Sequence, residues 1–345
     1  MTNNSSSNEF YKPEKCPYLE EAAWRDEFLL TEGTYNHLVA IISINSISVL
    51  PTVLLNALVI FAVVTRKRLR NKATILLACL AGADLLTGLL GQPIRIATEV
   101  QRILKKGTFC SNLERVSTLS LIWHKFATLT HLVLITVDRY IAIKKPLRYR
   151  DIVTTRRVTV AVLSVWTFAI FVVISEVILS GVNSGADMYN IYLTIWDLVL
   201  ITVTSISIIS IIRMYSYIFS ETGRQQRSQT EHLSAEEIAT IRRNNRAAKT
   251  LGIVLGTLLA TYLPTIIFII MYYSVNLERR VLNCIASWVA TLVMLGSLCN
   301  PLVYCWRKDR GIAPGLFGDS SFKKSRKQPV RRSDRGASHS TSSLA

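Results

Sequence analysis

The sequence predicts an all-helical (all-α) membrane protein, a bundle of seven transmembrane helices. Half of the 345 residues are hydrophobic and only 18% are charged, whereas a soluble domain carries about 25% charged residues. Seven apolar stretches are long enough to cross a bilayer, which takes roughly 20 residues per helix. Because these stretches greatly exceed the roughly 10 alternating residues of a membrane β-strand, they favour helices over a barrel.

The predicted spans follow a polar segment, residues 1–37, which we expect to be extracellular. The spans cover residues 38–65, 73–98, 112–142, 158–180, 188–219, 247–274 and 283–306. Ser234-Ala-Glu-Glu237 has the capping-box pattern that starts a helix, so the sixth helix is expected to begin well before the membrane. We therefore predict a membrane domain over residues 38–310 and a disordered tail, rich in Ser, Lys and Arg, over residues 311–345.

Charge is distributed unevenly along the chain, which has a net charge of +17. Residues 66–72 hold five basic side chains and no acidic one. Residues 139–157 hold seven basic side chains and one acidic one, and residues 307–345 hold ten basic side chains and three acidic ones. Residues 1–36 hold three basic side chains against seven acidic ones. Because basic segments next to spans stay in the cytosol, the N-terminus is expected outside and the C-terminus inside. The basic surplus then faces anionic membrane lipids, not nucleic acid.

Polar and charged residues inside the spans carry the strongest functional signal, because a charge at a helix centre costs roughly 2.5–3.5 kcal/mol. In chain order the landmarks are Asn56 in Leu-Leu-Asn-Ala-Leu-Val-Ile, Asp84 in Leu-Ala-Gly-Ala-Asp, Asp138-Arg139-Tyr140, Trp166, Pro264 and Asn300-Pro301-Leu-Val-Tyr304. Together, over about residues 38–310, they resemble the rhodopsin-like (class A) G-protein-coupled receptors. Residues 138–157 are similar to the adenosine and melanocortin receptors in particular. The resemblance implies a plasma-membrane receptor, not an enzyme, that passes binding of an extracellular ligand to a heterotrimeric G protein.

The resemblance also implies which residues couple the receptor to its G protein. Arg139 is expected to leave Asp138 on activation and to meet inward-facing tyrosines. Tyr262 stands where the family usually has Trp. Asn244 stands where an acidic residue often locks Arg139, which predicts ligand-independent signalling. The implied residues are Asp138, Arg139, Tyr140, Tyr215, Tyr262, Pro264, Asn300, Pro301 and Tyr304.

A group of oxygen-bearing side chains at bilayer depth suits a small hard cation. It consists of Asp84, Thr128, Ser297 and Asn300. The resemblance implies a sodium ion there that favours the resting state, and it implies no other cofactor. A purely structural polar cluster joining spans two, three and seven is the alternative.

The resemblance implies a ligand pocket between spans three, five, six and seven. Leu121 stands where amine receptors carry Asp, which argues against a biogenic amine, and the seventh span has no Lys for retinal. Lys125 is expected to bind a carboxylate or phosphate of an anionic or peptide ligand. An internal salt bridge to Glu176 or Asp197 is the alternative. The predicted pocket residues are Arg95, Glu99, Leu121, Lys125, Glu176, Trp196, Asp197 and Trp288.

The cysteines depart from the family's pattern, which usually links span three to the second outer loop. Residues 180–190 contain no Cys, and the outer candidates are Cys16, Cys110 and Cys284. We expect a Cys16–Cys284 disulfide, with Cys16–Cys110 as a close rival. An oxidising outer face permits either bond.

Both chain ends carry modification signals. Asn3 and Asn4 each open an Asn-x-Ser sequon, which predicts glycosylation on the outer side. A cluster of Ser and Thr over residues 338–343 is expected to be phosphorylated by a receptor kinase and to recruit arrestin, as the resemblance implies.

Two other functions stay open at this point. One is a constitutively active or decoy receptor. The other is a transporter or channel, which would bury Asp84, Lys125 and Glu176 along a polar path. Transporters commonly show internal repeats, and this sequence shows none.

Overall fold

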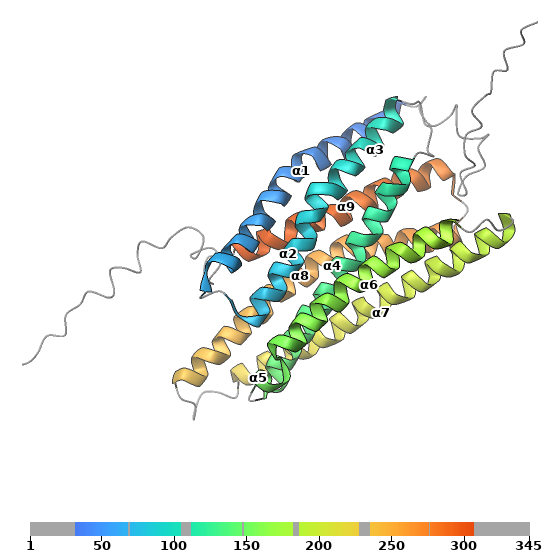
Figure 1. Cartoon of the computed structure of the whole chain (residues 1–345). Coiled ribbons are helices and arrows are strands. Elements are labelled where there is room, and N and C mark those ends of the chain that lie inside the picture. Colours follow the sequence, from blue (N-terminus) through green and yellow to red (C-terminus); the bar gives the residue numbers. More distant parts are fainter. Residues whose placement is uncertain are drawn as a thin grey trace, which may run out of the picture.

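The computed structural model has helices over all seven predicted spans (Figure 1). It describes residues 32–67, 70–104, 112–146, 148–181, 186–227, 235–275 and 277–306. The elements are α1 (Glu32–Thr65), α2 (Lys72–Leu86), the π-helical turn η2 (Thr87–Gly91), α3 (Gln92–Leu104), α4 (Asn112–Lys144), α5 (Tyr149–Ile152), α6 (Thr155–Gly181), α7 (Ala186–Arg227), α8 (Ala235–Ser274) and α9 (Arg279–Trp306).

The second span is one continuous rod made of α2, η2 and α3. Pro93 follows the first residue of α3 and has no N–H to donate to the preceding turn. The N–H of Gln92 bonds instead to the carbonyl of Thr87, five residues earlier. The wider π turn therefore accommodates the proline without breaking the helix.

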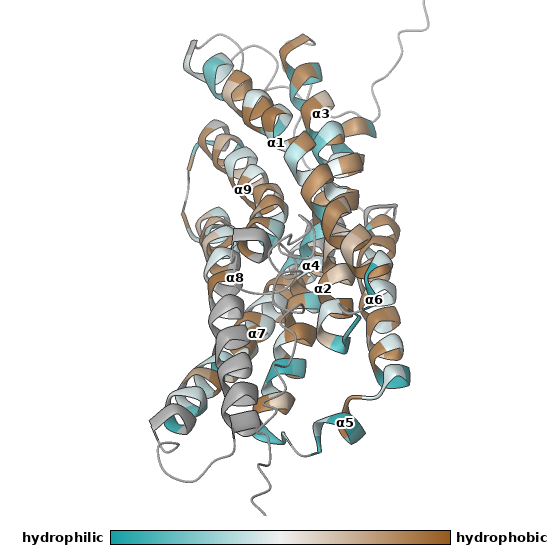
Figure 2. Cartoon of the chain, turned by 90° about the vertical axis from the view of Figure 1, so that its left-hand side faces the viewer, coloured by the Kyte–Doolittle hydropathy of each residue, from teal (hydrophilic) through white to brown (hydrophobic). Residues whose placement is uncertain are grey.

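In the described part of the chain, six spans are long and apolar enough to cross a membrane, and α8 adds the shorter apolar stretch Leu259–Ser274. Their outward faces expose large hydrophobic side chains, for example Ile47 and Leu163. Figure 2 shows this apolar colouring along most of α6. α8 begins at Ala235, directly after Ser234, as the capping-box pattern predicts.

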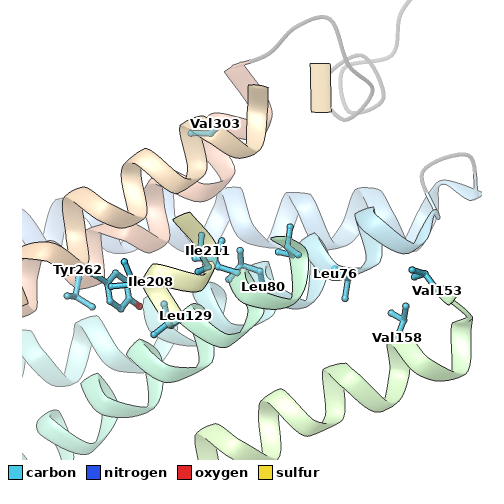
Figure 3. Packing of buried hydrophobic residues seen from close by; sticks show 12 residues of the cluster. Leu76, Leu80, Leu129, Val153, Val158, Ile208, Ile211, Tyr262 and Val303 are labelled. Atoms are coloured by element: carbon cyan, nitrogen blue, oxygen red, sulfur yellow. The ribbon is translucent and has the colours of Figure 1, made fainter. Parts of the chain in front are cut away.

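α4 lies at the centre of the bundle. It packs against the rod of α2 and α3, against α6 and α7, and more lightly against α8 and α9, while α1 packs between α2, α3 and α9. A hydrophobic cluster joins α4 to α2, α7 and α8 through Leu80, Leu129, Ile211 and Tyr262 (Figure 3). Polar and charged side chains lie next to this cluster and at both ends of α4.

Candidate functional site

Asp84 and Asn300 meet at the centre of the bundle. Both side chains are buried, and Asn300 Nδ2 donates to Asp84 Oδ2 at 2.8 Å. The other carboxylate oxygen, Oδ1, is buried and has no hydrogen-bond partner. A nearby bond runs from Asn56 Nδ2 to the backbone carbonyl of Ser297 at 3.1 Å, so α1, α2 and α9 are tied together here.

His124 lies between the remaining members of this polar core. Its Nδ1 is 2.6 Å from Thr87 Oγ1 and 3.3 Å from Thr128 Oγ1, and its Nε2 is 3.3 Å from Ser297 Oγ. The ring is buried. The oxygens of Asp84, Thr128 and Ser297 therefore fit a hard cation by chemistry, but the hydroxyls of Thr128 and Ser297 also contact the imidazole.

Lys125, one residue further along α4, is half-buried. Its ammonium group lies 5.1 Å from the centre of the Phe126 ring. Asp197 and Glu176 are the acids whose charges act on it, but in the described part of the chain no ion pair within 4 Å holds it. Tyr262 Oη donates to the backbone carbonyl of Lys125 at 3.0 Å, which fixes α8 against α4.

A carboxylate and two aromatic side chains of α7 and α8 lie in the same part of the bundle as Lys125. Tyr273 Oη donates to Asp197 Oδ2 at 2.8 Å. Trp196 packs against the hydrophobic group of Phe126 and Leu200, while its indole Nε1 is buried without a partner. Leu121 packs on the central hydrophobic cluster and offers no polar atom.

A second group of charges, which we call the Glu99 cluster, lies at the end of the bundle where α4 begins. Glu99 is fully buried and pairs with Arg95 at 2.5 Å and with Arg102 at 2.8 Å. Arg102 also pairs with Glu114 of α4, and Ser287 of α9 accepts hydrogen bonds from both arginines. The members are Arg95, Glu99, Arg102, Glu114 and Ser287. The cluster joins α3, α4 and α9.

A third group, the Asp138 group, lies at the other end of α4. Arg139 Nε donates to Asp138 Oδ2 at 2.8 Å, and the two side chains form an ion pair. Tyr149 Oη, from α5, donates to Asp138 Oδ1 at 2.7 Å. Burial and this hydrogen bond raise the pKa of Tyr149 above its usual range, so the phenol stays a donor at neutral pH.

Several predicted residues lie outside what the structure describes. These are Cys16, Cys110, Asn3, Asn4, the phosphorylation cluster of the tail, and the side chains of Asn244 and Tyr304. The disulfide, the glycosylation and the roles of these side chains stay predictions. Trp288 is described, and its ring contacts His37 of α1 edge-on, with centroids 6.4 Å apart.

Comparison with known proteins decides the family. The family model described as 7 transmembrane receptor (rhodopsin family) matches residues 55–304, which is most of the chain and contains the Asp84 core, Lys125 and the Asp138 group. The protein belongs to the rhodopsin family of seven-transmembrane receptors. It is thus a multi-pass plasma-membrane receptor.

Individual relatives of this receptor are distant and differ in what their names say they bind. Lysophosphatidic acid receptor 3 of Rattus norvegicus is 25% identical over 81% of this chain and 78% of its own length. Histamine H2 receptor of Rattus norvegicus is 26% identical over 74% of this chain and 72% of its own length. Trace amine-associated receptor 5 of Mus musculus is 29% identical over 75% of this chain and 78% of its own length. Nearness to adenosine or melanocortin receptors stays a prediction.

The receptor's geometry adds residues that the sequence analysis did not select. Arg95 and Glu99 were predicted to line the ligand pocket, and the structure pairs them with each other and with Arg102, Glu114 and Ser287. The spacing of Arg95, Glu99 and Arg102, at three and four residues on a helix, was the available signal. Tyr149 gave no such signal, because it reaches Asp138 from a separate short helix.

Proposed function

We propose that this receptor recognises the anionic group of an extracellular ligand through Lys125 and transmits binding to a heterotrimeric G protein through the Asp138 group. The supporting observation is the position of Lys125: it is half-buried on α4, the charge of Asp197 acts on it, and in the described residues it has no ion pair within 4 Å. A half-buried ammonium group without a bonded counter-ion attracts a carboxylate or phosphate.

The proposed orientation puts the Glu99 cluster outside and the Asp138 group in the cytosol. The unequal distribution of Lys and Arg along the chain supports it, because basic loops stay on the cytosolic side. Arrestin and a receptor kinase are proposed as further cytosolic partners of the Ser- and Thr-rich tail. At the bundle centre we propose a sodium ion bound by Asp84, Thr128, Ser297 and Asn300, with Asp84 Oδ1 as the oxygen that still lacks a partner.

A ligand must bind the active arrangement more tightly than the resting one, since equal affinity shifts no population. A ligand bound to Lys125 could favour the active arrangement over the resting one through a contact between two helices. The backbone carbonyl of Lys125 accepts the hydrogen bond from Tyr262 of α8, so a ligand that pulls on Lys125 also acts on the contact between α4 and α8. The Asp138 group lies further along the same helix, α4.

The test is a chemical library screened on cells that express the receptor, with Lys125→Met and Lys125→Arg in parallel. An anionic ligand is expected to signal through the parent and Lys125→Arg and to lose at least tenfold in potency with Lys125→Met. Arg139→Ala is expected to bind the ligand without G-protein activation. An anionic ligand that signals equally through Lys125→Met would overturn the proposed site.

An amine ligand is the second candidate, because the carboxylate of Asp197 lies close enough to Lys125 for its charge to act there and two relatives are named for amines. Leu121 cannot supply the carboxylate that would hold an amine on α4. The same screen separates the two classes. A cationic ligand lost with Asp197→Asn and unaffected by Lys125→Met would favour the amine.

A further inference from the structure

Tyr215 of α7 occupies a notch on α8 that exists because residue 252 is glycine; we call it the Gly252 notch. A Cβ placed on Gly252 would overlap Tyr215 Oη and would lie 2.7 Å from Cζ and 3.3 Å from Cε1 of the same ring. Carbon atoms in contact normally stay about 3.5–4.0 Å apart. Because three neighbouring atoms of a rigid ring are in the way, a side chain at position 252 must displace the whole ring.

The helical conformation of α8 does not itself require glycine at this position. Gly252 lies inside the helix Ala235–Ser274, where glycine is less favourable than alanine because it loses more conformational freedom on folding. Gly256, one turn further along α8, is exposed, and a Cβ there would meet nothing within 4 Å. The need for glycine at position 252 therefore comes from the neighbouring helix, α7, which packs against α8.

The notch holds the part of α7 that contacts the end of α4 carrying Arg139. The centre of the Tyr217 ring lies 5.0 Å from that of Tyr140, which directly follows Arg139. Tyr215 comes two residues before Tyr217 on α7. One short stretch of α7 thus contacts α4 through Tyr217 and α8 through Tyr215, so the notch sets how closely α8 approaches this end of the bundle.

We propose that Gly252 is a positioning residue for G-protein coupling. It seats Tyr215 against α8 and thereby stabilises the arrangement in which Arg139 stays paired with Asp138. When this end of the bundle rearranges for a G protein, any movement of α8 away from α7 must take Tyr215 out of the notch. The effect on signalling rests on the proposed function, whereas the effect on packing needs neither ligand nor G protein.

Thermal unfolding of the purified full-length receptor in detergent measures the effect on packing. Gly252→Ala is expected to lower the unfolding temperature, because overpacking a tight contact destabilises a fold. Gly256→Ala is the matched control on the same helix. It is expected to leave the unfolding temperature unchanged or to raise it, as alanine does where the backbone is already helical. If Gly252→Ala is as stable as Gly256→Ala, the notch does not hold Tyr215 and the proposal fails.

Removing the ring tests whether Tyr215 is the obstacle. In a Tyr215→Ala background, Gly252→Ala is expected to cause no further fall in the unfolding temperature, because the added methyl group then has space. Two residues in direct contact show this kind of non-additivity. If Gly252→Ala alone is poorly expressed, adding Tyr215→Ala is expected to restore surface expression. An equal loss with and without the ring contradicts the proposal.

Second-messenger output in transfected cells, corrected for surface expression, measures the positioning role. Ligand-independent output is expected to rise roughly fivefold or more with Gly252→Ala, since an overpacking penalty on one arrangement shifts a two-state equilibrium by at least that factor. Gly256→Ala is expected to stay at the parent level, and adding Arg139→Ala to Gly252→Ala is expected to remove the rise. A lower unfolding temperature without a rise in output would overturn the positioning role. The proposed coupling function fails separately, if Arg139→Ala alone keeps the full ligand response.

Discussion

The two ends of α4 carry arginine–carboxylate groups that are built in opposite ways. In the Glu99 cluster, ion pairs and hydrogen bonds connect three helices, and Glu99 is fully buried. In the Asp138 group, the bonds that Asp138 and Arg139 make within the described part of the chain stay in α4 and the adjoining α5. Arg139 also keeps 17% of its side chain exposed.

This difference indicates which end of the bundle is fixed and which end can open. Breaking a buried ion pair between helices leaves a desolvated charge, which is costly. Releasing Arg139 from a neighbour on its own helix requires no helix to separate from another. We infer that the Glu99 end acts as a fixed frame, while the Asp138 end rearranges when a partner binds.

Glu99→Gln is expected to have the largest effect. It leaves Arg95 and Arg102 buried without the carboxylate they share, which should lower the free energy of unfolding by about 3–5 kcal/mol. Thermal unfolding of the purified receptor measures the loss, and reduced surface expression is expected alongside it. Ser287→Ala, which removes hydrogen bonds but no charge, is the matched control and should cost about 1 kcal/mol. Equal stability of the two variants would show that the Glu99 cluster is not a frame.

Asp138→Asn tests the movable end. It removes the charge partner of Arg139 and weakens the bond from Tyr149, so stability should fall by about 1.5–3 kcal/mol. Ligand-independent signalling should rise, because Arg139 is then free to meet the G protein. Second-messenger output in transfected cells, corrected for surface expression, measures the rise, with Arg139→Ala as the inactive reference. Output no higher than that reference would contradict a releasable Arg139.

The sequence alone predicted most of the helices, because apolar length and helix-start signals act locally along the chain. The seven helical spans and the start of α8 after Ser234 followed from such patterns. The π turn was not predicted. It depends on how the N–H of Gln92 finds Thr87 once Pro93 has removed a donor, which is a property of the folded turn.

The candidate site was predicted less completely, because its contacts join distant parts of the chain. Asp84 and Asn300, named from motifs, do meet. Whether Arg95 and Glu99 face a ligand or each other depends on Ser287 and Glu114, which come from two other helices. No pattern along the sequence predicts that side chains from these different helices come into contact. Tyr273 likewise acquires a role only because Asp197 lies opposite it.

Tyr149→Phe should have a smaller effect than Asp138→Asn, since it removes one hydrogen bond and keeps the ion pair. We expect a loss of about 1 kcal/mol in stability and a partial rise in ligand-independent signalling. The pKa of Tyr149 is raised in the folded receptor, so its contribution is complete below the ordinary tyrosine pKa of about 10 and is lost only above it. The difference between parent and variant should therefore be the same at pH 6 and pH 8. A difference that changes between these two values would contradict the raised pKa.

Glu221→Gln should have the smallest effect and completes the comparison. Glu221 pairs with Arg224 at 3.1 Å on α7, but 79% of the arginine side chain is exposed. An ion pair in contact with water contributes about 0–1 kcal/mol, so thermal unfolding should change far less than with Glu99→Gln. Raising the salt concentration should reduce even this small difference, whereas the effect of Glu99→Gln should persist because water and ions are excluded from Glu99. If both variants lose stability equally, burial does not distinguish the frame from the surface, and the assignment of a fixed and a movable end fails.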